Sequence, residues 1–404
     1  MRRLSEQIKS YRRQFLAVAA NEYRTIFTDK GVMLVLVFAL LIYSTVYSLA
    51  YKPQVLRDVP IAVIDDCKTA ASRDLVTLFD AGPNTYVACQ PAGMKEARRL
   101  LYDREIYGIV YIPENYERQL AGGLQAVVPI YADASYFLVY RQVFQELVTG
   151  INLTGARVEF GRLLAKGAIE PAARATTQPV IYQTHNLFNP YLGYGSFVMP
   201  AIIMVIIQQT LLIGIGMIGG TWREYGLYSI LVPPGRKRMA TLPAVLAKAV
   251  VYASIYGVTS LYVLSLHYRM FNYPMNGSPW TVVAMMIPYL AACIFMGIAV
   301  STLFRYRENS LLLLLWTSIP ILMLSGASLP AQAIPEWLYR FGKVFPSSSG
   351  VNAFVRIQTM GASFDEVMPE IRTLWCLAVI YGGLACIGIH LRSRQAQQNL
   401  PAGQ

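Results

Sequence analysis

The sequence is poor in charge and in the residue types that build catalytic and metal sites. Only 14% of its 404 residues are Asp, Glu, Lys or Arg, where about 25% is typical of soluble domains. It has three histidines and five cysteines, and no Cys/His cluster has the spacing of a zinc site. No G-x-x-x-x-G-K-S/T motif occurs, so the chain cannot hold ATP in a P-loop. These absences predict that the chain is not an enzyme and carries no metal or cofactor of its own.

Hydrophobic residues are in excess instead. They make up 55% of the chain, against roughly 45–50% in soluble domains, so the composition predicts an integral membrane protein. The net charge of +12 raises nucleic-acid binding as an alternative. The basic residues cluster at the ends of apolar runs, however, and form no continuous basic stripe. Membrane topology therefore explains the charge better than nucleic acid does.

Six apolar runs are candidates for transmembrane helices, since about 20 residues are needed to cross roughly 30 Å of hydrocarbon. The predicted spans cover residues 31–51, 192–220, 244–266, 281–304, 310–325 and 371–391. The fifth is the shortest, and Pro320 within it predicts a kinked or partly re-entrant element. The first could instead be a cleaved signal, but its length and its long preamble favour a retained anchor.

Lys and Arg in short loops set the orientation, because these residues resist translocation. With six spans, one side collects the basic residues of the N-terminal tail, the second-to-third loop, the fourth-to-fifth connection and the tail 392–404. The opposite third-to-fourth loop has only Arg269. We expect a multi-pass protein of the bacterial cytoplasmic (inner) membrane with both termini in the cytoplasm.

Residues 1–30 have the pattern of a basic amphipathic helix. The apolar face is formed by Leu4, Ile8, Tyr11, Phe15 and Val18. Such a helix at the start of a span is expected to lie in the cytoplasmic membrane interface. The alternative is a solvated helix that packs on a partner.

Residues 52–189 have ordinary soluble composition and follow the first span. Runs such as "VPIAVID" and "GIVYIP" predict strands that alternate with helices, which is typical of a small α/β domain. This domain is expected outside the cytoplasm, since long loops translocate regardless of charge. Cys67 and Cys89 fall near the ends of neighbouring predicted strands. A disulfide between them is one interpretation, and two small buried hydrophobic residues are the other. The predicted fold is thus an α-helical integral membrane protein with six transmembrane helices and an inserted α/β extracytoplasmic domain.

Polar and small residues inside the second span are candidate functional positions. Gln208 and Gln209 lie near its middle, where each must find a partner or water. They predict either a transport path or an interhelical hydrogen bond across a dimer seam. Gly216 and Gly220 have the small-xxx-small spacing that permits close helix packing.

A broken apolar stretch, "LSGASLPAQAIPEWLYRFGKVFPSSSGVNAFVRI", follows the fifth span. Its prolines prevent one straight helix, so we expect two short helices that dip into the outer leaflet over residues 326–350. An ordinary external loop with an interfacial helix is the alternative. The residues of this external hairpin are Ser325, Gly326, Pro330, Pro335, Trp337 and Pro346.

In the order of its elements, the chain resembles the permease subunits of ABC-2 type exporters. "LFNPYLGYGSFVMP", with Asn189 and Pro190, is similar to the asparagine-proline start of that family's second span. "WREYGLYSILVPPGR" resembles its cytoplasmic arginine-glutamate-x-glycine element, and the broken stretch resembles its external hairpin. The chain departs from the family at Ala201, where glycine is usual, and at Leu227 to Ser229.

The resemblance implies a coupling helix at residues 221–232 that docks on a separate ATPase subunit. Arg223 and Glu224 would make charge-assisted contacts, Tyr225 and Tyr228 would be the anchors, and Gly226 would permit close backbone approach. A loop that merely satisfies the positive-inside rule is the alternative. The expected partners are an ABC ATPase that binds Mg-ATP, a second permease copy or paralogue, a periplasmic adaptor and membrane lipid.

Three functions compete at this point. The leading hypothesis is an ATP-driven exporter of a hydrophobic or amphipathic substrate by alternating access. A non-transporting envelope scaffold or signalling protein is the alternative. A secondary transporter is disfavoured, because the predicted spans carry no Asp or Glu at mid-depth and the chain has no internal repeats.

Overall fold

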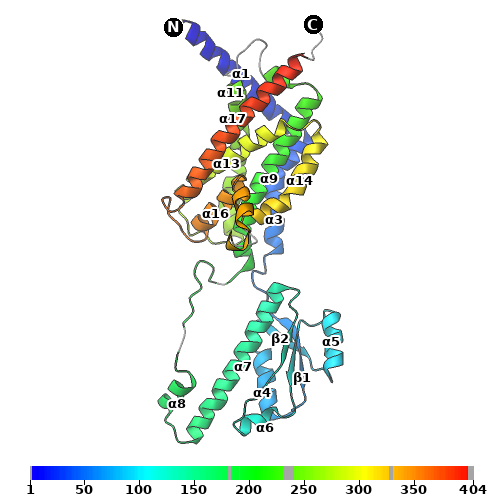
Figure 1. Cartoon of the computed structure of the whole chain (residues 1–404), viewed down its shortest axis with the longest axis vertical. Coiled ribbons are helices and arrows are strands. Elements are labelled where there is room, and N and C mark those ends of the chain that lie inside the picture. The colour runs from blue at the N-terminus through cyan, green and yellow to red at the C-terminus, as the bar shows by residue number, and fades with distance from the viewer. Residues whose placement is uncertain (1, 181–182, 191, 232–240, 327–330, 399–404) are drawn as a thin grey trace. The chain divides into compact units, whose positions relative to one another are not determined.

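A computed structural model describes residues 2–180, 183–190, 192–231, 241–326 and 331–398. The chain divides into two compact units, one helical and one α/β (Figure 1). The α/β unit is Val55–His185, and the helical unit combines Met1–Gln54 with Asn186–Gln404.

The α/β unit contains a four-stranded sheet in the order β2-β1-β3-β4. β1 is parallel to β2 and β3, while β4 is antiparallel to β3. The strands are β1 (Val59–Asp65), β2 (Thr85–Cys89), β3 (Gly108–Ile112) and β4 (Ile130–Ala132). The helices are α4 (Ala70–Asp80), α5 (Met94–Tyr102), α6 (Tyr116–Ala121), α7 (Phe137–Ala165) and α8 (Glu170–Thr177). The parallel pairs follow from the helical crossovers α4 and α5, since parallel strands cannot be joined by tight turns.

The two faces of this sheet have separate cores because side chains alternate along each strand. Ile61 and Val63 of β1 pack with α4 and α7, whereas Ala62 and Ile64 pack with α5 on the other face. Figure 1 shows α5 across the sheet from α4 and α7.

The sequence-based disulfide between Cys67 and Cys89 is not formed in this structure. Both thiols are free. Cys67 packs against the core on the α4 and α7 side, and Cys89 against the core on the α5 side. A disulfide needs Cα atoms within about 7 Å and Cβ atoms that point toward each other. The sheet separates the two side chains, so the alternative interpretation, two partly buried hydrophobic residues, describes them. Burial raises the pKa of the Cys89 thiol, which makes it a poor nucleophile at neutral pH.

The helical unit begins with α1 (Arg2–Thr28) and a first apolar segment made of α2 (Lys30–Met33), the π-helix η1 (Leu34–Phe38) and α3 (Ala39–Ala50). The next elements are α9 (Tyr194–Glu224), α10 (Tyr228–Leu231), and α11 (Leu242–Tyr262) continued by η3 (Val263–His267) and α12 (Tyr268–Met270). The last are α13 (Pro279–Ser301), α14 (Arg307–Leu324), η4 (Ala331–Ala333), α15 (Glu336–Gly342), α16 (Pro346–Gln358) and α17 (Met368–Gln398).

Five helical segments of the described chain are long and apolar enough to cross a membrane. They are Lys30–Ala50, Tyr194–Glu224, Leu242–Met270, Pro279–Ser301 and Met368–Gln398. The fifth sequence-based span coincides with α14, an uninterrupted helix that contains Pro320 and is not among these five. A sixth span therefore stays a prediction.

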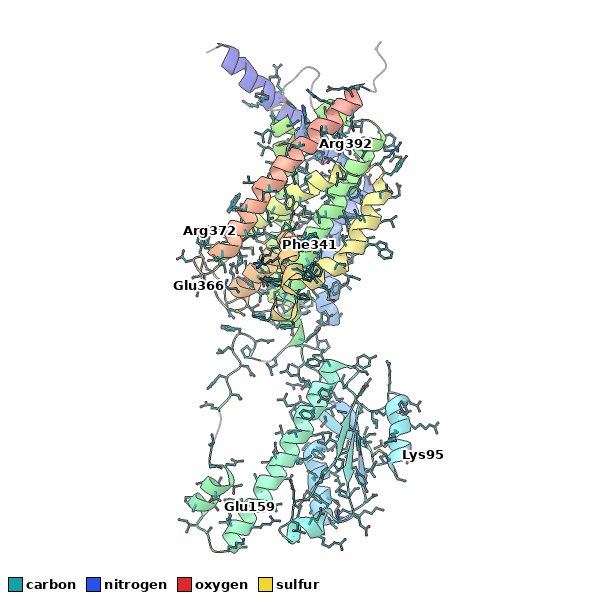
Figure 2. All side chains as sticks on the ribbon, in the orientation of Figure 1. Lys95, Glu159, Phe341, Glu366, Arg372 and Arg392 are labelled. Atoms are coloured by element: carbon teal, nitrogen blue, oxygen red, sulfur yellow. The ribbon has the colours of Figure 1, made fainter. Side chains whose placement is uncertain are left out.

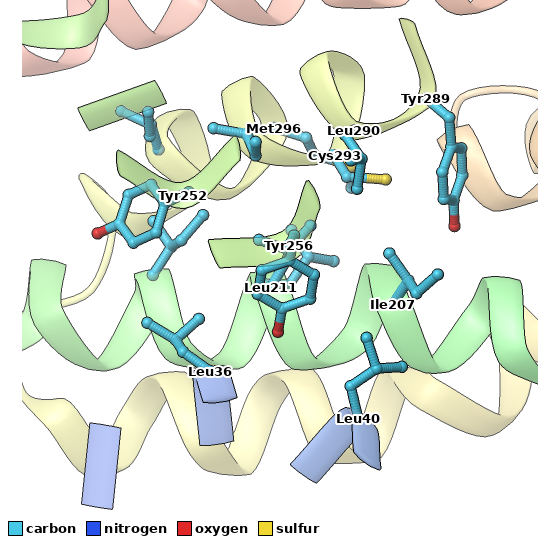
Figure 3. Packing of buried hydrophobic residues seen from close by; sticks show 14 of the residues in the cluster. Leu36, Leu40, Ile207, Leu211, Tyr252, Tyr256, Tyr289, Leu290, Cys293 and Met296 are labelled. Atoms are coloured by element: carbon cyan, nitrogen blue, oxygen red, sulfur yellow. The ribbon is translucent and has the colours of Figure 1, made fainter. Parts of the chain in front are cut away.

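α9 is the central helix of this unit. In the most apolar stretch of α9, 89% of the residues are buried, compared with 28% in the corresponding stretches of Lys30–Ala50 and of α17. Figure 3 shows Ile207 and Leu211 of α9 packed among Leu36 and Leu40 of the first segment and Tyr256 of α11. A helix that contacts so many others transmits any displacement of its end to them, because close-packed interiors do not deform freely.

α1 packs on its own bundle instead of standing apart from it. Its buried residues Val18, Glu22 and Ile26 recur every fourth position, and Phe15 packs beside them. This repeat places them on one helical face, and α11 lies against α1. The apolar face inferred from the sequence is thus covered by the chain's own helices at Phe15 and Val18.

The broken stretch after α14 contains two helices, α15 and α16. Gly326 has φ +80°, a backbone conformation that favours glycine, and it follows the end of α14. Pro335 precedes α15 and Pro346 begins α16, positions that suit a residue without an N–H. Trp337 is 71% exposed, whereas Pro346 is buried. Pro330 lies outside the described residues.

Candidate functional site

The end of α9 stops abruptly at a glycine turn. Gly226 has φ +66°, and the N–H of Leu227 donates to the carbonyl of Trp222 at 2.8 Å. This is the hydrogen-bond pattern of a Schellman motif, in which glycine is preferred because it has no Cβ. A short helix, α10, follows within two residues. The motif reverses the chain and leaves a compact projection that consists of Glu224, Tyr225 and Gly226.

Two aromatic residues on either side of this turn are buried. Trp222 is 2% and Tyr228 4% exposed, and their rings meet edge to face with centroids 6.2 Å apart. The Tyr228 hydroxyl donates to the carbonyl of Gly219 at 3.3 Å, and burial raises its pKa to about 12. Tyr228 is therefore an anchor within this chain, and its side chain is not available to a partner in this structure.

The remaining residues of the predicted coupling element divide into inward and outward groups. Arg223 donates to the carbonyls of Leu303 at 2.9 Å and Phe304 at 3.4 Å, just after α13. Glu224 and Tyr225 are exposed, the tyrosine by 70%. Only Glu224, Tyr225 and Gly226 of the five predicted residues thus present a free surface.

A second arginine also binds the carbonyls at the end of α13. Arg392 of α17 donates through Nε to the Thr302 carbonyl at 2.7 Å. Cations near helix C-termini satisfy carbonyls that have no helical partner and interact favourably with the helix dipole. Figure 2 shows Arg392 toward one end of α17 and Arg372 toward the other. The end of α13 is therefore joined to α9 by Arg223 and to α17 by Arg392.

A buried ion pair lies next to Trp222. Lys248 of α11 donates to both carboxylate oxygens of Glu22 of α1, at 2.7 and 2.6 Å, and the Tyr252 hydroxyl donates to the same carboxylate. Glu22 is 0% and Lys248 6% exposed. The Lys248 ammonium also lies 4.3 Å from the centroid of the Trp222 ring, a cation–π contact. We call Glu22, Lys248, Tyr252 and Trp222 the ion-pair cluster.

The ion-pair cluster was not identified from the sequence, although it left a signal there. Lys248 falls inside the predicted third span, and an ionisable residue at such a position requires a buried partner. Its partner precedes it by 226 residues, between the buried apolar residues Val18 and Ile26 of α1. A second bond ties α1 to α10, since Gln14 donates to the carbonyl of Leu231 at 2.6 Å.

A partly exposed ion pair joins Arg307, the first residue of α14, to Asp29, the residue between α1 and α2. Asp29 accepts from the N–H groups of Gly31 and Val32 at the start of α2 and from Arg307 Nη2 at 3.0 Å. The hydrogen bond from Arg307 is the main reason that the pKa of Asp29 is lowered. Asp29 thus caps the first apolar segment and fixes it to the start of α14.

The two central glutamines of α9 have different surroundings. Gln208 Oε1 accepts from the N–H of Ser347, at the start of α16, at 2.7 Å, while its Nε2 has no hydrogen-bond partner among the described residues. Neither polar atom of Gln209 has a partner among those residues, although its side chain is only 7% exposed. Gln208 therefore supports α16 through its oxygen, whereas both polar atoms of Gln209 are left without a partner among the described residues.

Gly216 and Gly220 bring α9 close to α14. A Cβ at Gly216 would lie 3.0 Å from the Cβ of Ser310, and one at Gly220 would lie 2.8 Å from the backbone of Tyr306 and Arg307. Backbone atoms cannot move aside as a flexible side chain can. The two glycines thus serve packing within this chain, and a role at a dimer seam stays a prediction.

Asn189 and Gln54 organise the start of α9. The Asn189 side chain exchanges two hydrogen bonds with Gly193, at 2.9 and 3.1 Å. Gln54, just after the first apolar segment, accepts from the N–H of Ser196 at 3.0 Å. These bonds satisfy N–H groups that the first helical turn leaves without partners. Pro190 adjoins this turn, where its carbonyl accepts from Asn186 at 3.3 Å.

The described residues contain no group of three or more His, Cys, Asp or Glu side chains that could hold a metal ion. What the helical unit does contain is a buried central helix with an exposed turn, held to its neighbours by ionic and aromatic contacts.

Comparison with known proteins defines the class. Residues 30–387 match the family described as ABC-2 family transporter protein. The chain therefore belongs to this family and is a multi-pass membrane permease.

Named relatives agree with this assignment. The chain is 23% identical over 389 residues to the inner membrane transport permease YhhJ of Escherichia coli K12, covering 93% of this chain and 96% of that protein. It is 26% identical over 196 residues to the probable multidrug ABC transporter permease YbhR of the same strain, covering 48% and 51%. A shorter match of 115 residues at 25% identity, which covers 28% of this chain and 16% of the relative, is to ABC transporter G family member 20 of Dictyostelium discoideum.

Proposed function

We propose that this permease is the membrane subunit of an ATP-driven exporter, and that Mg-ATP is hydrolysed on a separate ATPase chain. The turn at Glu224, Tyr225 and Gly226 is the surface that the ATPase contacts. The observation that carries this proposal is that an exposed tyrosine and carboxylate project from the end of the most buried helix. Exposed aromatic residues beside a charge are typical anchors of protein interfaces.

The contacts behind the turn support a mechanical role. Trp222 and Arg223 join the end of α9 to α11 and to the end of α13, and the Glu22–Lys248 pair extends the connection to α1. Movement of the turn would therefore displace several helices together as rigid bodies, which is the kind of transition that alternating access requires.

The substrate class and the assembly are further parts of the proposal. We infer a hydrophobic or amphipathic substrate, drug-like, lipid or peptide, that leaves the cytoplasm or the inner membrane. The multidrug name of the relative YbhR is compatible with this class. A second permease copy or a paralogue completes the path, where the side chain of Gln209, unpartnered among the described residues, would form hydrogen bonds with the partner subunit or the substrate. A periplasmic adaptor is a further expected partner. Both termini lie in the cytoplasm, and the α/β unit lies outside it.

A copurification experiment tests the ATPase contact. The protein is solubilised in detergent from its own cells as wild type, Glu224→Ala, Tyr225→Ala and Tyr102→Ala. Tyr102, on the α/β unit, is 82% exposed and is the matched control. We expect an ATPase chain to copurify with wild type and with Tyr102→Ala, and to be reduced about tenfold or more in the other two, the usual cost of an interface anchor.

Two outcomes would contradict the proposal. The first is the absence of any ATPase from the wild-type preparation, and the second is equal recovery with all four proteins. Either result favours the alternative, a non-transporting envelope scaffold or signalling protein, which has no need of an ATPase contact.

A further inference from the structure

An apolar groove lies away from the site described above. It runs between α13 and the continuous segment α11, η3 and α12, and its volume is about 600 Å³. Leu246, Val250, Leu261, Val283 and Ile287 are among its lining residues. Both walls belong to segments that are long and apolar enough to span the membrane. The groove is therefore open to an occupant from the hydrocarbon layer.

One end of the groove is polar and positively charged. Arg269, after η3, lines this end together with Gln358. Its guanidinium is exposed and has no hydrogen bond or ion pair among the described residues. An arginine of this kind is a donor fork that matches a phosphate group.

The start of α13 adds to this positive end. Pro279, its first residue, lines the groove, and the preceding Ser278 makes no side-chain capping bond. The N-terminus of a long helix carries a partial positive charge and N–H groups without helical partners, both of which favour an anion. Charge and polarity are therefore concentrated where the groove ends, and apolar side chains line the rest.

Along α11, η3 and α12 the groove extends over twenty-three positions, from Leu246 to Arg269, which is about 35 Å along a helix axis and comparable to the whole hydrocarbon core of a bilayer. Its part from Gly257 to the charged end is about 18 Å long, close to the roughly 15 Å that one leaflet contributes to that core. Within this part lies Ser260, a buried residue whose hydroxyl has no partner in the described chain.

We propose that this groove binds a membrane phospholipid, with the phosphate on Arg269 and one acyl chain between α11 and α13. The charged end selects an anionic headgroup, and the apolar walls accept the acyl chain without sequence-specific contacts. Such a lipid fills space between two helices of the permease and so remains bound longer than lipids on a flat helical surface.

A substitution at Gly257 should block the groove without disturbing the fold. A Cβ at this position meets nothing within 4 Å, and the residue lies inside α11. Gly257→Phe therefore places a ring in the acyl-chain path. Val258→Phe is the matched control, since Val258 is the next residue, is 71% exposed and does not line the groove.

The experiment is native mass spectrometry of the full-length protein in detergent, titrated with phosphatidylglycerol or phosphatidylethanolamine. We expect wild type and Val258→Phe to retain phosphatidylglycerol equally, and Gly257→Phe to bind both lipids about tenfold more weakly. Arg269→Gln should weaken phosphatidylglycerol binding by about tenfold and abolish the preference over phosphatidylethanolamine. Arg372→Gln, at an exposed arginine of α17, should leave binding unchanged.

The size-exclusion profile and the melting temperature establish that each variant is folded. If the phenylalanine ring lowers the melting temperature, Gly257→Leu replaces Gly257→Phe. Equal lipid retention by wild type and by the folded groove variants would overturn the proposal, because it would mean that the bound lipid is a nonspecific surface layer. So would a loss of binding that Val258→Phe and Arg372→Gln share.

Discussion

Two buried polar sites in the helical unit differ in how completely their hydrogen bonds are made. In the ion-pair cluster, both oxygens of Glu22 accept from Lys248, and Tyr252 donates to the same carboxylate. At the middle of α9, neither polar atom of Gln209 has a partner among the described residues, and Gln208 has one that does not.

The contrast distinguishes a buried ion pair whose hydrogen bonds are complete from a pair of glutamines that can still gain hydrogen-bond partners. A satisfied buried network holds one arrangement, because any other would leave a charge unpaired in low dielectric. Unsatisfied buried amides already bear that desolvation cost, so a new partner or water would lower the free energy. The first site is therefore expected to be strongly destabilised by the loss of one charge alone. At the second site, Gln209 is expected to tolerate an apolar substitution without loss of stability, although the substitution should affect function.

Breaking the ion pair should give the largest effect. Lys248→Met leaves the Glu22 carboxylate buried without a counter-ion, which typically costs about 3–5 kcal/mol. We expect a large fall in the melting temperature of the detergent-solubilised protein, read by intrinsic tryptophan fluorescence.

Two variants calibrate that result. The double variant Glu22→Gln with Lys248→Met removes both charges and should recover most of the loss. Arg340→Met breaks the exposed pair with Glu336, whose side chains are 74% and 77% exposed, and should cost no more than about 0.5 kcal/mol. Similar losses of stability in Lys248→Met and Arg340→Met would contradict the expected difference between a buried and a surface ion pair.

The glutamines should differ from each other by a smaller amount. Gln208→Leu leaves the buried N–H of Ser347 without its acceptor, at a cost of about 1–3 kcal/mol. Gln209→Leu removes two unpartnered polar atoms and should leave the melting temperature unchanged or raised. If transport is assayed as export of a fluorescent apolar dye, Gln209→Leu should reduce it. A destabilised Gln209→Leu would show that this residue has a partner in the assembled protein.

A substitution in the turn at the end of α9 should have a smaller effect on stability than Gln208→Leu. Gly226→Ala puts a Cβ on a left-handed residue and should destabilise by about 1 kcal/mol. Gly383→Ala is the matched control, because Gly383 is helical and a Cβ there meets nothing within 4 Å. It should be neutral or slightly stabilising. Equal melting temperatures for the two alanine variants would argue against the strained turn.

In exposure, the Asp29–Arg307 pair lies between the buried Glu22–Lys248 pair and the exposed Glu336–Arg340 pair, and breaking it should have a small effect. The folded-state pKa of Asp29 is lowered, so its contribution to stability is present above the unfolded value of about 4 and is lost as pH falls through the folded-state value. We expect Asp29→Asn to be less stable than wild type at pH 6, by no more than about 1 kcal/mol, with the difference shrinking toward pH 3. A difference that is independent of pH would show that the charge of Asp29 does not contribute to stability.

Local patterns in the sequence predicted most of the helices and strands, but not the ion pairs that hold the helices together. "VPIAVID" is β1, "GIVYIP" contains β3, and the apolar run at 192–220 lies in α9 from Tyr194 onward. These follow from residue type and period over a short window. The Glu22–Lys248 and Asp29–Arg307 pairs join residues more than two hundred positions apart, and no local period encodes such a pairing.

The coupling element shows the same limit at single residues. Its position at 221–232 followed from a resemblance, and the reversal at Gly226 explains why the chain projects there. Whether a tyrosine in it points outward or inward was decided by neighbours distant in sequence. Tyr225 is exposed, and Tyr228 is covered by its contact with Trp222 and by the carbonyl of Gly219.

The long separation within the ion-pair cluster has a consequence for biosynthesis. Lys248 leaves the ribosome 226 residues after Glu22, a delay of about 10–45 s at ordinary rates of translation. Until α11 has been inserted, Glu22 has no counter-ion and must remain in water, so α1 docks after three apolar segments have been made. The helix that is synthesised first thus cannot dock before the third apolar segment has been made, and a nascent chain stalled before residue 248 would present α1 to chaperones and proteases as an unattached amphipathic segment.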